Sequence, residues 1–84
     1  MATLAEIEQN LLNASLSGNA TLFKSTINSI TETQKTQISG SILADTLYNI
    51  TQLSSASTAA SMTRTMMSAL GSHIDTYTIG FAMA

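Results

Sequence analysis

The chain has 84 residues, of which three are Lys or Arg, five are Asp or Glu and one is His, so its net charge is −2. A chain of this length forms one domain at most. It has no Cys, which excludes disulfide bonds and a structural zinc site. Three cations are too few for the basic surface of a nucleic-acid-binding protein, so we expect no nucleic-acid partner.

Uncharged polar side chains replace the missing charges, since 34 of the 84 residues are Ser, Thr, Asn or Gln. Charged residues make up 10% of the chain, against about 25% in a typical globular domain. A chain this short buries only about 60% of the surface that its unfolded form exposes. We therefore expect an all-α chain that folds mainly within a polymer, where low charge lets neighbouring copies approach.

The first predicted helix covers residues 4–16. Thr3 and Glu6 have the spacing of a capping box, and apolar residues follow at helical spacing from Leu4 to Ala14. The step Ser17-Gly18-Asn19 is expected to end this helix and to provide the N-cap of the next one. No basic segment followed by an apolar one precedes this helix, so we expect no cleavable secretory signal.

Two further helices are predicted over residues 22–38 and 42–72. Phe23, Ile27 and Ile30 lie on one face of the earlier helix. Leu43, Leu47 and Ile50 form an apolar stripe on the later one. Because a lone glycine can sit inside a helix at a cost of about 1 kcal/mol, Gly40 is a weak break. A helical hairpin and one long bent helix both remain open.

Every residue from 54 to 61 is Ser, Thr or Ala. Such a run cannot build a thick core, but it lets a helix pack closely against another backbone. No stretch approaches the 18 apolar residues of a membrane-spanning helix, so we predict no stable membrane insertion.

The last eight residues alternate strictly between large apolar residues, Tyr77 to Met83, and small or polar ones. This period of two is typical of a strand. A frayed helix end and an extended tail docked on a neighbouring copy are the alternatives. In an assembly, Tyr77 and Phe81 would be adhesive contacts.

Catalytic chemistry has little support in this sequence. In an extended segment His73, Asp75 and Tyr77 would share one face, with Ser72 beside them as a nucleophile. A lone surface histidine in a Ser-rich chain explains this pattern more simply. There is no nucleophile-elbow motif or glycine-rich phosphate loop, and no acidic spacing indicates a metal site. We expect no enzyme activity, no cofactor and no bound metal. Because an imidazole gains a proton between pH 8 and pH 5, His73 would make a polymer pH-sensitive.

Two stretches carry a resemblance to a known family. Ile30-Thr31-Glu32-Thr33-Gln34 is followed about one helix length later by Leu47-Tyr48-Asn49 and then by the small-residue run. Over residues 27–75 the chain resembles the RebB-type proteins that polymerise into R-bodies, the coiled ribbons of some bacteria. The resemblance implies a helical ribbon subunit in the bacterial cytoplasm, with a coiled and an extended form that interconvert with pH in some members.

The chain is also similar to the needle or pilus subunits of type III secretion systems, which are short helical hairpins without Cys. The step Tyr48-Asn49-Ile50 carries this second resemblance. It implies a filament subunit of an extracellular appendage.

Our leading hypothesis is that residues 1–84 form a single helical subunit of a homopolymer. Whether a homologous second subunit assembles with it is left open. The predicted assembly interface consists of Leu43, Leu47, Ile50, Ala56, Ala59, Ala60, Met62, Met66, Leu70, Tyr77 and Phe81. A small helical adaptor that binds a partner helix through Met62 and Met66 is the alternative of another class. A membrane-active peptide fits less well, because the first helix carries Glu6 and Glu8 and no cation.

Overall fold

The computed structural model describes residues 2–74, which form an all-α fold and confirm the predicted class. The predicted strand or docked tail, with Tyr77 and Phe81, lies outside the described residues. The elements are α1 (Leu4–Ser17), α2 (Ala20–Ser29), α3 (Glu32–Lys35), α4 (Gly40–Thr51), α5 (Ala56–Leu70) and the short 3₁₀ helix η1 (Gly71–His73).

The abundant small polar residues cap these helices. The side chains of Thr3, Asn19, Thr31, Ser39 and Ser55 each accept a hydrogen bond from the backbone N–H three residues further on, at the start of α1 to α5 respectively. The capping box predicted for α1 is confirmed, because the Glu6 carboxylate also accepts the Thr3 N–H at 3.0 Å. Four of these five caps are Ser or Thr, so the residues that replace charge in this chain also start its α-helices.

These caps also correct two predicted boundaries. The helix predicted over residues 22–38 ends at Ser29, because Ile30 is extended and Thr31 caps α3. The helix predicted over residues 42–72 is interrupted after Thr51, and Ser55 then caps α5. The apolar periodicity continued across both breaks, so it concealed them.

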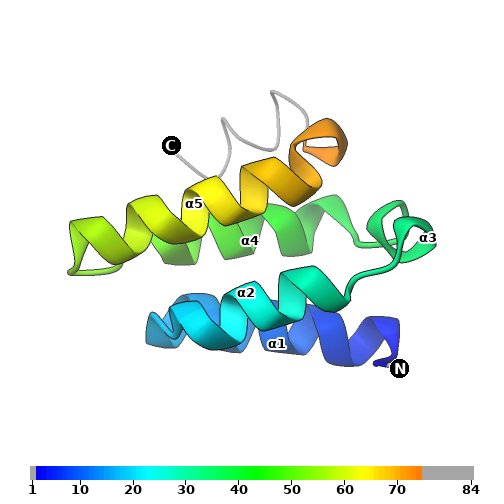
Figure 1. Cartoon of the computed structure of the whole chain (residues 1–84), viewed down its shortest axis with the longest axis horizontal. Coiled ribbons are helices and arrows are strands. Elements are labelled where there is room, and N and C mark those ends of the chain that lie inside the picture. The colour runs from blue at the N-terminus through cyan, green and yellow to red at the C-terminus, as the bar shows by residue number, and fades with distance from the viewer. Residues whose placement is uncertain (1, 75–84) are drawn as a thin grey trace.

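The result is two helical hairpins rather than one hairpin or one long rod. Figure 1 shows α1 and α2 as one antiparallel pair and α4 and α5 as another, connected through α3. Helix α1 packs against α2 and α4, and α5 packs against α2 and α4. Around the bundle the order is thus α1, α2, α5, α4, and the α2/α5 side lies opposite the α1/α4 side.

The core lies between the hairpins and receives side chains from α1, α2, α4 and α5. Its largest fully buried side chains are Phe23, Ile7, Leu11, Leu43, Ile50, Met62, Met66 and Leu70. All buried apolar side chains of the described residues belong to one cluster. The core of the described residues is thus enclosed by a single copy, whereas the sequence predicts a chain that folds mainly within a polymer.

Buried polar groups are satisfied locally. The hydroxyls of Thr26 and Thr46 donate to the carbonyls of Leu22 and Ile42, one helical turn earlier. Within residues 2–74 no buried side-chain nitrogen or oxygen lacks a hydrogen-bond partner. Ser and Thr can therefore enter this core without an unpaired polar group.

Candidate functional site

The structure divides the predicted assembly interface into three groups. The six large side chains, Leu43, Leu47, Ile50, Met62, Met66 and Leu70, are buried in the core of the single chain. They pack between the two hairpins and are not exposed for contact with another copy. Their helical periodicity predicts a stripe between copies, whereas in the structure it marks the inward faces of α4 and α5.

The alanines of α5 form the second group and lie closer to the surface. Ala56 and Ala60 are exposed, while Ala59 is half-buried and packs against the core. Met67 follows Ala56 and Ala60 on the same side of the helix and is 38% exposed. We call Ala56, Ala60 and Met67 the α5 ridge. Tyr77 and Phe81, the third group, lie outside the described residues.

The Met-rich face proposed for an adaptor is turned inward. Met62 and Met66 are 1% and 0% exposed. A partner helix could reach them only if α5 left the bundle. Of this cluster, only Met67 presents its side chain to solvent.

His73, the predicted pH-sensitive residue, lies in η1 at the end of α5 and is exposed. Ser72 is its exposed neighbour in the same short helix. Asp75 and Tyr77, the other residues of the hydrolase alternative, lie outside the described residues. Among residues 2–74, no group of three His, Asp or Glu side chains is placed to hold a metal ion.

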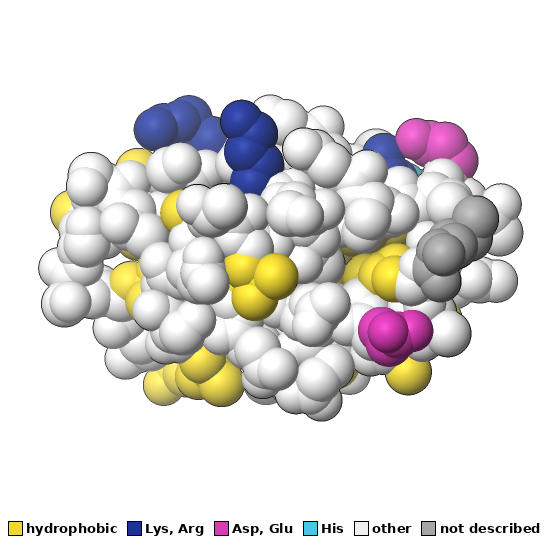
Figure 2. Space-filling view, turned by 60° about the horizontal axis from the view of Figure 1, so that its bottom comes forward, with side chains coloured by type: hydrophobic (Ala, Val, Ile, Leu, Met, Phe, Trp, Pro, Cys, Tyr) yellow, Lys and Arg dark blue, Asp and Glu magenta, His cyan; other side chains and the backbone are white. Residues whose placement is uncertain are grey.

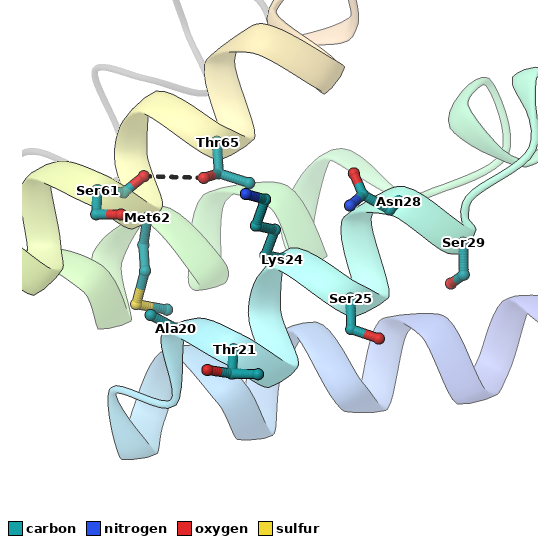
Figure 3. A pocket seen from close by; sticks show the side chains of 9 residues that line it. All are labelled: Ala20, Thr21, Lys24, Ser25, Asn28, Ser29, Ser61, Met62 and Thr65. Atoms are coloured by element: carbon teal, nitrogen blue, oxygen red, sulfur yellow. Dashed lines mark hydrogen bonds between the residues drawn. The ribbon is translucent and has the colours of Figure 1, made fainter.

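A surface groove between α2 and α5 was not predicted from the sequence. Its larger part has a volume of about 660 Å³ and is lined by Ala20, Thr21, Lys24, Ser25, Asn28 and Ser29 from α2 and by Ser61, Met62 and Thr65 from α5. Figure 3 shows the Lys24 side chain extending from α2 toward α5. The Thr65 hydroxyl is committed to the Ser61 carbonyl at 3.0 Å, drawn as the dashed line.

The groove continues along the same two helices. A second hollow of about 450 Å³ shares Lys24, Asn28, Ser61 and Thr65 with the first, and adds Ile27, Arg64, Ser68 and Ala69. Two of the three cations in the chain, Lys24 and Arg64, thus line one groove. Its ammonium, guanidinium, hydroxyl and amide groups can donate hydrogen bonds to carboxylates.

Acidic and basic residues lie on different helices. Helices α1 and α4 carry only Glu6, Glu8 and Asp45, whereas α2 and α5 carry only Lys24 and Arg64. The charges of α3 pair with each other, because Lys35 Nζ lies 2.9 Å from Glu32 Oε1. Figure 2 shows two dark-blue groups along one edge of the molecule without an acidic group beside them.

The groove and this charge separation depend on which helices are neighbours. From the sequence, Ser25 and Asn28 look like an ordinary solvated face of one helix, as do Ser61 and Thr65. Only the packing of α2 against α5 brings the two polar faces together.

Comparison of the chain with protein-family models, with curated proteins and with solved structures gives no match. Of the helices that the structure describes, none has the length and apolar character needed to cross a membrane.

Proposed function

We propose that this protein is a structural subunit that assembles with copies of itself into a filament or ribbon of the R-body type. The observation that carries the proposal is the α5 ridge, where Ala56 and Ala60 are exposed one turn apart on a helix whose opposite side is already packed. The needle-like filament subunit is the alternative of the same class.

Small side chains favour close packing between copies. Because Ala56 and Ala60 project little beyond the helix, the backbone of a neighbouring helix can come close to α5 there. Met67 adds a flexible apolar side chain that adapts to the neighbour's surface. The low total charge adds little repulsion between copies.

In this proposal the subunit is folded before it assembles. Leu43, Met62 and Met66 stabilise the single copy, and the ridge supplies contact between copies. The polymer predicted from the sequence is thus retained, but its proposed interface is the α5 ridge and not the large apolar side chains. The R-body resemblance implies a ribbon in the bacterial cytoplasm, and the needle resemblance implies a filament outside the cell.

The test is negative-stain electron microscopy of the purified chain beside the variant Ala60→Glu. The longer, charged side chain would block the close approach of a neighbouring helix and would have to lose its water between copies, so we expect ribbon assembly to be lost. Asn13→Glu is the matched control, because it adds the same charge at an exposed position of α1, which α5 does not pack against. Assembly of Ala60→Glu at the wild-type concentration would reject the ridge as an interface.

The pH response is tested with the same images at pH 7 and pH 5. Every added copy repeats the exposed His73, the residue that the sequence predicts to be pH-sensitive. We expect the ribbon of the wild-type chain to change shape and that of His73→Gln to keep one shape. Discrete small particles of the wild-type chain at both pH values would reject the polymer itself.

A further inference from the structure

Opposite sides of the bundle carry opposite charges. In Figure 1, α2 and α5 lie in front of α1 and α4, and the view is along the shortest dimension of the molecule, 19 Å. The front therefore presents the groove with Lys24 and Arg64. We call this side the cationic face.

The back of the bundle carries the acidic residues of the α1/α4 seam. Glu8 lies at this seam, since its Oε2 accepts the Ser39 N–H at the start of α4 at 3.3 Å. Asp45 is exposed on α4 one turn before Asn49, whose side chain contacts Ser15 of α1. Residues one turn apart share a side of a helix, so Asp45 and Glu8 belong to the same acidic face.

We propose that the cationic face of one copy docks onto the acidic face of the next copy. The proposal rests on the proposed function, because it names the surfaces through which the subunit polymerises. The occupant of the groove is the acidic face of a second copy, whose two carboxylates, Glu8 and Asp45, equal the two cations in number and are opposite in charge. Lys24 and Arg64 have no salt-bridge partner among residues 2–74.

The placement of the faces determines the kind of polymer. Because they lie on opposite sides of the bundle, each copy that docks through one face leaves its other face free. Such a head-to-tail contact does not close on itself and produces an open filament. The α5 ridge borders the cationic face, because Ala60 lies one turn before Arg64, but its stripe differs from that of the groove residues Ser61, Thr65 and Ser68. It supplies lateral contacts that join filaments into a ribbon.

The groove lining also fits a contact of this kind. Besides the cations, it offers hydroxyl and amide groups of Ser25, Asn28 and Ser61 for hydrogen bonds to the neighbouring copy. The back of the bundle contributes Tyr48, which is half-exposed on α4 three residues after Asp45. Charge pairing then sets the orientation and register of the copies, while the polar and aromatic contacts add affinity.

Charge reversal on each face provides the test. The variant Lys24→Glu/Arg64→Glu has two acidic faces, and the variant Glu8→Lys/Asp45→Lys has two basic faces. Each alone should raise the critical concentration for assembly, measured by sedimentation, at least tenfold. An equimolar mixture of the two should restore assembly, because the acidic faces of one now meet the basic faces of the other.

Two controls separate docking from folding. Because Glu8 also contacts the Ser39 N–H, the single variant Asp45→Lys repeats the test with Glu8 intact. The variant Glu32→Lys/Lys35→Glu exchanges the two charges of α3, which belongs to neither face. It should leave the critical concentration unchanged. Helix content by circular dichroism at concentrations below assembly should match the wild-type chain in every variant.

The outcomes distinguish this inference from the proposed function. If the wild-type chain forms no polymer, the proposed function and this inference fail together. If the wild-type chain polymerises and the face-reversed variants polymerise equally well, only this inference is overturned. It is also overturned if the mixture assembles no better than its components while both variants keep their helix content.

Discussion

Asn49 on α4 donates a hydrogen bond of 3.1 Å from its side-chain amide to the hydroxyl of Ser15 on α1, 34 residues earlier in the chain. Ser15 is fully buried, and its hydroxyl in turn donates to the Leu12 carbonyl at 3.0 Å. This polar link joins the two hairpins within an otherwise apolar seam. Because a hydrogen bond needs correct geometry, it favours one register of α1 along α4.

We expect Ser15→Ala and Asn49→Ala each to lower the free energy of unfolding by about 0.5–1.5 kcal/mol, the usual net worth of a hydrogen bond. The double variant should lose less than the sum of the two, because both remove the same bond. Urea denaturation measures all three. Strict additivity would show that the contact does not couple the hairpins. Asn13→Ala, on the exposed side of α1, is the control and should change stability little.

The two glycines that follow the C-terminal ends of α1 and α5 give opposite predictions. Gly18 has φ +70°, and a Cβ placed there would lie 3.3 Å from the Leu53 side chain. Gly18→Ala should therefore destabilise the fold by about 1–2 kcal/mol, the cost of a left-handed L-residue.

Gly71 is the matched control for this prediction. Its φ of −57° and ψ of −35° are right-handed helical, and an added Cβ would make an ordinary contact of 3.9 Å with Met67. Gly71→Ala should be neutral or stabilise by about 0.4–1 kcal/mol, because alanine has fewer unfolded conformations. Thermal unfolding compares the two variants, and equal shifts in Tm would contradict the assigned backbone conformations.

Met66→Ala tests the assignment of the large predicted interface residues to the core. Met66 is fully buried, so its truncation should cost about 2–5 kcal/mol in a single copy. Met67→Ala, at the next position on α5 but 38% exposed, should change stability by less than about 0.5 kcal/mol. Denaturation below the assembly concentration measures both. If the Met66→Ala chain is as stable as the wild type, Met66 belongs to the interface between copies and not to the core.

Stability should depend on pH through the Glu6 capping box. The backbone N–H of Thr3, followed by the Thr3 hydroxyl, holds the pKa of the Glu6 carboxyl below its ordinary value of 4.5. The unfolded chain therefore binds this proton more readily than the folded chain. The stabilisation is present above the unfolded pKa and disappears as the pH falls through the lower folded pKa.

The variant Glu6→Gln isolates this contribution. Glutamine can still accept the Thr3 N–H but does not titrate, so part of the loss of helix stability below pH 4.5 should be absent from this variant. Thermal unfolding followed by circular dichroism between pH 2 and pH 6 compares it with the wild-type chain. Identical pH profiles of the two chains would show that the capping box contributes nothing to the acid response.

Local signals in the sequence determined the helical class and the start of the chain. The Thr3–Glu6 box and Gly18 bracket α1, so the helix predicted over residues 4–16 differs from the observed Leu4–Ser17 by one residue. Each cap bonds a backbone N–H only three residues away, so capping can be predicted from the local sequence alone. Thr31 and Ser55 carried the same signal, but the apolar periodicity on both sides of each break concealed it.

The partners of each apolar face were decided only by tertiary structure. The period of Leu43, Leu47 and Ile50 shows that one side of a helix is buried, but it does not show whether the covering surface belongs to the same chain. The break before α5 lets that helix fold back, so the second hairpin packs on the first and encloses its own core. The same packing brings Lys24 and Arg64 to one groove and places Glu8 and Asp45 on the opposite side, because helix neighbours depend on the whole arrangement of the chain.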